Sequence, residues 1–173
     1  ACQLVSGDMI VMCGRFELHS AFEIIARIFG LTGGAFAMPT GYNIAPGRDI
    51  AIITSEGGKN RISVCHWGFV PPWGKELGDG YKMINAKAEN LTSSRAYGPL
   101  VGKFRHRCLI VADGFYEWMK AEDPKQPRQP WHFTVDGGEP FAFAGICTRK
   151  EWEDDEERGG GQGAGHEGGE DRP

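Results

Sequence analysis

The sequence predicts an α+β fold that consists mainly of antiparallel strands, arranged as a curved sheet or partly closed barrel with few helices. Only residues 20–29 have the apolar spacing of an amphipathic helix. Short runs rich in β-branched and aromatic residues recur from residue 50 to residue 146, and glycine-rich turn sequences separate several of them. One helix and many strands in 173 residues are typical of a single α+β domain.

The helix is predicted from its ends and from one apolar face. Ser20 and Glu23 have the spacing of a capping box, and Gly30 follows as a C-terminal stop. The apolar residues that share one face are Phe22, Ile25, Ala26 and Phe29. We therefore expect this face to pack against the sheet.

The remaining elements are predicted as strands joined by turns. We expect strands over residues 50–54, 62–67, 107–112, 115–119, 131–135 and 141–146. Residues 56–60 read as a turn between the first two strands, and Asp136-Gly137-Gly138 predicts a hairpin between the last two. Residues 31–48 read as loop because glycine and proline interrupt them, and residues 1–11 show no clear pattern.

The negative charge lies at the C-terminal end. Residues 1–150 carry 17 Lys and Arg against 14 Asp and Glu, whereas residues 151–173 carry 2 against 9. This last segment also holds 7 glycines, so it cannot bury enough apolar surface to offset its ordering entropy, and we expect it to be disordered. The mildly basic remainder permits an anionic partner.

The sequence shows neither a membrane segment nor an export signal, and we expect a cytoplasmic protein. Its five cysteines are scattered and include no CxxC pair, which argues against a disulfide framework. The nearest approach to a zinc ligand set is Cys65, His66, His106 and Cys108. Their spacing matches no standard zinc pattern, so we expect no metal and no cofactor.

Six stretches combine polar and aromatic residues in the predicted loops and strand ends. They are VMCGRF (11–16), YNIAPG (42–47), WGFVPPW (67–73), INAKAEN (84–90), FRHRCLIVADGFYEW (104–118) and FAGI (143–146). Singly, each has a structural explanation: the aromatics could belong to the core, Asn85 could cap a turn, and Glu117 could face solvent from a strand.

Together, and in this order, the stretches resemble the SRAP family (SOS response-associated peptidase, the abasic-site processing proteins). The resemblance covers Met12 to Cys147. It implies that Met12 is removed and that the exposed Cys13 crosslinks covalently to an abasic site in single-stranded DNA. Only an N-terminal cysteine carries an amine and a thiol on adjacent carbons, and these two groups can close a thiazolidine ring on the sugar aldehyde. The enzyme classes implied are a hydrolase of the peptidase type and a lyase.

The resemblance also implies roles for particular residues. Cys13, Asn85 and Glu117 align with the catalytic residues. Positions at or near the family's DNA contacts are Arg15, Asn43, Pro46, Trp67, Trp73, Lys87 and Arg95. Lys87 stands where the family usually has arginine, which keeps the charge but loses the bidentate fork. We expect a monomer that binds abasic single-stranded DNA, without a membrane partner, and that is associated with the nucleoid if the source is bacterial.

The chain departs from the family pattern at both ends. Residues 1–11 read as a spurious or processed extension, residues 12–150 as the SRAP domain, incomplete at its C-terminal end, and residues 151–173 as the tail. The family has a further catalytic histidine in an IHDRMP-like motif after FAGI, and His166 is only a superficial echo of it. Two alternatives therefore stay open: a non-catalytic homologue that binds single-stranded DNA, and an N-terminal-nucleophile hydrolase or amidotransferase that uses Cys13.

Overall fold

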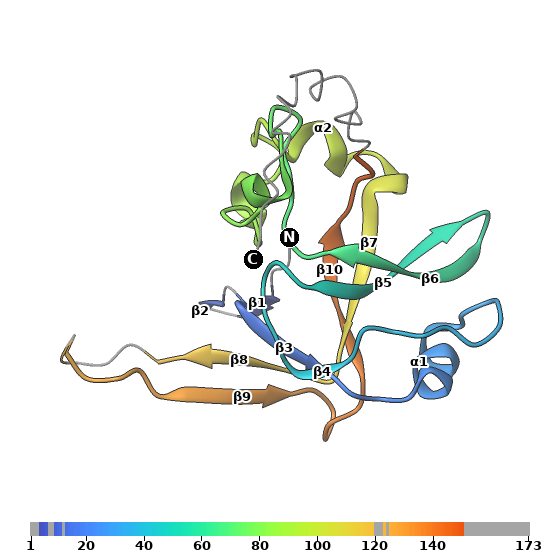
Figure 1. Cartoon of the computed structure of the whole chain (residues 1–173), viewed down its shortest axis with the longest axis horizontal. Coiled ribbons are helices and arrows are strands. Elements are labelled where there is room, and N and C mark those ends of the chain that lie inside the picture. The colour runs from blue at the N-terminus through green and yellow to red at the C-terminus, as the bar shows by residue number, and fades with distance from the viewer. Residues whose placement is uncertain (1–3, 7–8, 12, 120–122, 124, 151–173) are drawn as a thin grey trace, which may run out of the picture.

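The computed structural model describes residues 4–6, 9–11, 13–119, 123 and 125–150. Most of this is antiparallel β-structure with few helices, as predicted, and it is divided mainly between two four-stranded sheets (Figure 1). The first sheet has the order β10 (Phe141–Ile146), β7 (Arg107–Ala112), β5 (Asp49–Glu56) and β6 (Lys59–His66). The second has the order β4 (Gly41–Ile44), β3 (Arg15–Leu18), β8 (Gly114–Trp118) and β9 (Pro130–Thr134).

The predicted strands are all present. β7 and β10 have the predicted bounds, while β8 and β9 each begin and end one residue earlier than predicted. β5 and β6 extend further and form a hairpin that turns at Gly57 and Gly58, both of which have positive φ. The alternation of apolar and polar residues therefore located the strands well.

The connection at residues 136–138 differs from its prediction. The turn itself exists, with positive φ at all three residues and a hydrogen bond from the Gly138 N–H to the Val135 carbonyl. However, β9 pairs with β8, and β10 pairs with β7. The predicted hairpin between the last two strands is wrong, because this turn carries the chain from one sheet to the other.

Two segments without a strand prediction also contain strands. β4 lies inside the predicted loop 31–48 and pairs with β3. In residues 1–11, β1 (Leu4–Ser6) pairs with β2 (Met9–Val11). These strands have only three or four residues, which is too short for an alternating pattern to stand out.

The helix α1 (Phe22–Phe29) buries Ile25 and partly buries the rest of the predicted face, and it ends at Gly30, which is left-handed with φ 58°. The predicted capping box is wrong. Ala21 occupies the N-cap position without a side-chain cap, and the Ser20 hydroxyl instead donates to Asp113 at 2.7 Å. The buried Asp113 carboxylate therefore binds the Ser20 hydroxyl that would otherwise cap the helix.

The two sheets meet over an aromatic core. Phe143 lies edge-on to Phe16 and Phe115, with ring centroids 6.3 and 5.7 Å apart, and both Phe16 and Phe143 are almost fully buried. Residues 67–106 hold no strand and form a separate lobe with short helical turns and a small core that includes Phe69 and Tyr97. Its elements are η1 (Leu77–Gly80), η2 (Ala88–Asn90), α2 (Gly98–Val101) and η3 (Phe104–His106). No described helix is long and apolar enough to span a membrane.

Candidate active site

Cys13, Asn85 and Glu117 come together from three separate segments. Cys13 immediately precedes Gly14 and β3, Asn85 lies in the strandless lobe, and Glu117 lies on β8, which pairs with β3. The Asn85 amide donates to the Cys13 carbonyl at 2.8 Å. The Glu117 charge acts on the Cys13 thiol. The structure therefore brings all three expected catalytic residues to one place.

Trp67 positions the segment that carries Asn85. Its indole N–H donates to the Ile84 carbonyl at 3.3 Å, and its ring packs on Phe16 with centroids 5.2 Å apart. With 4% of its surface exposed, Trp67 cannot offer a face to a base in this conformation. Trp67, which the resemblance puts at or near the family's DNA contacts, thus lies in the wall behind Asn85.

Two buried oxygens at this site have no hydrogen-bond partner among the described residues, namely Asn85 Oδ1 and Glu117 Oε1. Leaving a buried polar atom unpaired costs about 1–3 kcal/mol, so such atoms are rare in folded proteins. Both belong to the residues that surround Cys13. The pair forms an acceptor surface that is suited to hydroxyl or amine donors of a ligand.

The electrostatics keep the thiol protonated and make the carboxyl group a better base. Burial, with a smaller contribution from the nearby Glu117 charge, raises the pKa of Cys13 to about 12. Burial also raises the pKa of Glu117 above its usual range. A carboxylate with a raised pKa accepts a proton more readily near neutral pH than an exposed one.

The other residues expected to contact DNA fall into two groups. In the lobe, the Arg95 guanidinium lies 4.7 Å from the ring centroid of Trp73, which is half-exposed, and Lys87 is exposed nearby in sequence at the start of η2. On the second sheet, Arg15 donates to the Asn43 side chain at 2.9 Å. Pro46 is partly buried in the loop after β4.

The β3–β8 register places the Arg15 and Glu117 side chains on different faces of the sheet. Arg15 lies opposite Tyr116, so these two side chains share one face of the sheet. Because successive residues alternate between faces, Glu117 projects from the other face. The Arg15 side chain, with Asn43 bonded to it, therefore lies on the face opposite Glu117, although the Arg15 carbonyl accepts from the Cys13 thiol at 3.4 Å.

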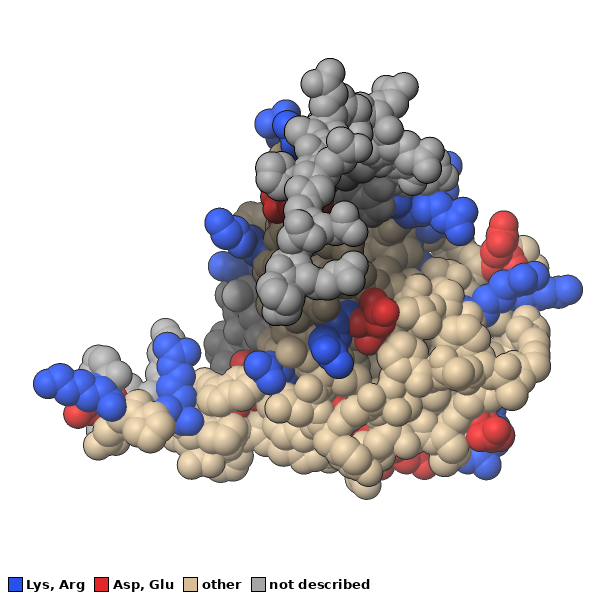
Figure 2. All heavy atoms as spheres, viewed as in Figure 1, with Lys and Arg blue, Asp and Glu red and all other residues tan. Residues whose placement is uncertain are grey.

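Trp131 lies at the candidate site although no sequence motif pointed to it. Trp131 lies on β9 directly opposite Glu117, and 54% of its surface is exposed. Directly opposed residues share a face and have Cβ atoms about 4.5–5.5 Å apart, so the Trp131 and Glu117 side chains leave the sheet as neighbours. The loop beyond it holds exposed Lys125 and Arg128, and Figure 2 shows basic side chains over the projecting end of this hairpin. Strand alternation identified β9, but only the β8–β9 register pairs Trp131 with Glu117.

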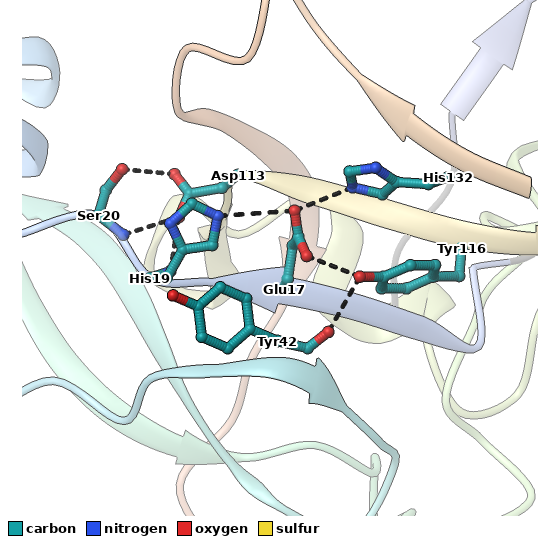
Figure 3. Close-up of polar contacts among 7 residues, drawn as sticks. All are labelled: Glu17, His19, Ser20, Tyr42, Asp113, Tyr116 and His132. Atoms are coloured by element: carbon teal, nitrogen blue, oxygen red, sulfur yellow. Dashed lines mark hydrogen bonds and ion pairs between the residues drawn. The ribbon is translucent and has the colours of Figure 1, made fainter.

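A second polar cluster occupies the opposite face of the same sheet (Figure 3). Buried Glu17 accepts from the Tyr116 hydroxyl at 2.7 Å and lies 2.9 Å from His132 Nε2. A side chain at Gly114 would fill the space where these groups meet, because its Cβ would come within 2.9 Å of Glu17 Oε1. The hydrogen bond from the Tyr116 hydroxyl to Glu17 raises the pKa of Tyr116 to about 12. This cluster holds β3, β8 and β9 in register behind the candidate site.

Asp113 anchors the same region from the turn between β7 and β8. Its carboxylate accepts from the backbone N–H groups of His19 and Ser20 at 2.5 and 2.8 Å, and from the Ser20 hydroxyl. It is 2% exposed. In the part of the chain that the structure describes, no three His, Cys, Asp or Glu side chains are grouped so that they could hold a metal ion.

Comparison with known proteins gives one consistent result. The pattern of the family "SOS response associated peptidase (SRAP)" matches residues 12–162. Abasic site processing protein YoaM of Bacillus subtilis is 41% identical over 144 residues, which cover 80% of this chain and 60% of that protein. Abasic site processing protein YedK of Escherichia coli is 32% identical over 143 residues, covering 75% of this chain and 61% of that one.

Solved structures share the fold. A protein from Bacteroides thetaiotaomicron superposes with a TM-score of 0.63 at 20% identity, covering 78% of this chain and 59% of that chain. A phage-related protein from Bordetella bronchiseptica has a TM-score of 0.61 at 32% identity, covering 78% and 60%. The chain thus spans about 60% of the length of these curated relatives.

Proposed function

Because this chain belongs to the SOS response associated peptidase (SRAP) family, we propose that it is an abasic site processing protein that captures abasic sites in single-stranded DNA through Cys13. The observation that carries the proposal is the meeting of Cys13, Asn85 and Glu117, with two buried oxygens unpaired beside the cysteine. The test is a denaturation-resistant adduct between a chain that begins with Cys13 and an abasic oligonucleotide. An intact oligonucleotide of the same sequence serves as the control.

The proposed reaction needs a free α-amine on Cys13. The amine attacks the aldehyde of the ring-opened abasic sugar, and one water leaves as the C=N bond of a Schiff base forms. The thiol then adds to this carbon, its sulfur forms the new C–S bond, and its proton ends on the nitrogen. The product is a five-membered thiazolidine, and the net loss is one water. The peptidase activity in the family's description would then be the processing that exposes Cys13.

The neighbouring residues have separate roles in this scheme. The α-amine must first be neutral, and its reference pKa of about 7.7–8.0 leaves it mostly protonated at pH 7. Glu117 then accepts the proton that the amine nitrogen loses as it attacks the aldehyde. Asn85 holds the Cys13 carbonyl through its amide, and its unpaired oxygen can accept from a sugar hydroxyl. An abasic nucleotide has no base to unstack, so moving it into the site costs less than flipping an intact one.

Single-stranded DNA would follow the exposed aromatic and basic groups around this site. Trp73 with Arg95, and Trp131 in the β8–β9 hairpin, supply stacking faces. Cations such as Lys87 can follow the phosphates. Arg15 and Asn43 lie on the opposite face of the sheet. They would contact the DNA only if the DNA wraps around the edge of the sheet.

The pH dependence of crosslinking tests the role of Glu117. Below the pKa of the α-amine, the logarithm of the rate is expected to fall with a slope of about 1 per pH unit, because one group must lose a proton. Where Glu117 also protonates, the slope should steepen to about 2, and because burial raises the pKa of Glu117 this happens above the pH at which an exposed glutamate protonates.

The matched variants are Glu117→Gln and Glu89→Gln, which replaces an exposed glutamate of η2. We expect Glu117→Gln to slow crosslinking at pH 7 by about 10²–10⁴-fold and to keep a slope of about 1 throughout. Glu89→Gln should retain the steepening. A Glu117→Gln profile that still steepens would exclude Glu117 as the base.

Trp131→Ala is expected to weaken binding of abasic single-stranded DNA by about 1–3 kcal/mol, because one stacking face is lost. Trp118→Ala is the matched control, since Trp118 lies in the same hairpin at 41% exposure but on the opposite face from Glu117. Fluorescence anisotropy in a Cys13→Ala background measures binding without crosslinking. Equal losses for the two tryptophans would contradict the assignment of the DNA path to the Glu117 face.

A further inference from the structure

Two thiols outside the candidate active site lie against each other at the end of the first sheet. Cys108 on β7 is directly opposite Gly145 on β10. Pairing continues one step beyond β10, because the Cys147 N–H donates to the His106 carbonyl at 2.8 Å. Cys147 is therefore a diagonal neighbour of Cys108 on the same face, and the two thiols hydrogen bond to each other.

Gly145 makes this contact possible. A Cβ at Gly145 would come within 2.7 Å of the Cys108 sulfur, which no folded protein tolerates without a shift. The absence of a side chain on the opposed residue thus lets the Cys108 sulfur lie across the partner strand towards Cys147. Cys147 follows the last residue of β10, and closing the remaining distance to a bonded sulfur pair requires the chain there to shift.

The two thiols differ in acidity. The hydrogen bond from Cys108 lowers the pKa of Cys147 to about 7, against the opposing effect of burial. The same hydrogen bond, together with burial, raises the pKa of Cys108. A thiolate is the reactive form of cysteine, so Cys147 is the nucleophile and Cys108 is the protonated partner.

Small molecules have a route to the pair. A cavity of about 200 Å³ is lined by both cysteines together with Cys65, Trp67, Leu77 and Lys150. Cys147 is partly exposed, whereas Cys13 is 3% exposed and its thiol stays protonated. The pKa of Cys65 is raised by burial. Cys147 is therefore both accessible and readily ionised to the thiolate.

We propose that Cys108 and Cys147 form an oxidisable dithiol, a modification site that peroxides convert to a disulfide. The Cys147 thiolate attacks one peroxide oxygen, the O–O bond breaks, and the displaced oxygen leaves as water or an alcohol after taking up a proton. The Cys108 thiol then attacks the resulting sulfenic acid, and a second water leaves as the S–S bond forms. Two thiols are oxidised and one peroxide is reduced. This site is independent of Cys13 and of the DNA chemistry.

The test uses the full chain and hydrogen peroxide at neutral pH. We expect a protein lighter by two hydrogen atoms, and a non-reducing peptide map in which residues 108 and 147 are joined. A reductant should reverse the change. Before oxidation, alkylation of Cys147 should be faster than that of Cys65 by on the order of tenfold, because more of Cys147 is thiolate.

Two serine variants complete the test. Cys65→Ser should form the same disulfide, and Cys147→Ser should not lose two hydrogens through Cys108. The non-reducing peptide map of the unsubstituted chain tests the proposal even if Cys147→Ser fails to fold. The proposal is overturned if Cys147 proceeds to sulfinic acid without pairing, if Cys147 pairs with Cys65 instead, or if both thiols stay reduced.

Discussion

Replacing Cys13 by alanine is expected to abolish the denaturation-resistant adduct with abasic single-stranded DNA. Alanine keeps an N-terminal amine, but it has no thiol to close the ring. A Schiff base can still form and hydrolyse, so borohydride reduction should trap part of the protein on the DNA. Gel electrophoresis under denaturing conditions, with and without borohydride, measures both products.

Cys13→Ser provides the matched control for this result. Serine keeps an amine and a hydroxyl at the same spacing, and the oxygen analogue of the ring opens more readily than the thiazolidine. We expect little stable adduct from serine and efficient borohydride trapping, as for alanine. If Cys13→Ala gave as much stable adduct without borohydride as the cysteine protein, the thiol would have no part in the crosslink.

Asp113→Ala is expected to cause a large loss of stability. The buried carboxylate accepts three hydrogen bonds from His19 and Ser20, and its removal leaves two partly buried backbone N–H groups without this acceptor. Unpaired buried donors and lost charge-assisted bonds together cost about 3–5 kcal/mol. For a domain of this size that corresponds to a fall in melting temperature of about 10 °C.

Ser20→Ala distinguishes the contribution of the Ser20 hydroxyl from that of the Asp113 carboxylate. It removes only the hydroxyl donor and leaves both backbone bonds to Asp113 intact, so we expect a loss of about 1 kcal/mol. Urea unfolding followed by tryptophan fluorescence measures both variants. A loss for Asp113→Ala no larger than that for Ser20→Ala would show that Asp113 does not anchor the β7–β8 turn.

The sequence predicted strands better than it predicted how they pair. β7 and β10 alternate clearly and were located to the residue. The turn at residues 136–138 was also recognised, but turn residues specify only local φ and ψ. Whether the chain then returns to its own sheet depends on packing between distant segments, here on Phe143 against Phe16 and Phe115.

The same limit applies to the site. The resemblance pointed to Cys13, Asn85 and Glu117, which the structure brings together. It could not distinguish a tryptophan that supports the site from one that faces it, because Trp67 and Trp131 have the same chemistry and differ only in burial. Likewise, the sequence predicts Ser20 as a helix cap, and only the fold shows that its hydroxyl donates to Asp113 instead.

The central claim, that Cys13 closes a ring on an abasic sugar, is tested most directly by intact mass spectrometry of the adduct. The sample is a chain whose N-terminal residue is confirmed as Cys13, incubated with abasic single-stranded DNA. The predicted mass is the sum of protein and DNA less one water, unchanged by borohydride because a thiazolidine has no C=N bond to reduce. No adduct, or an adduct that gains two hydrogens with borohydride, would contradict the claim.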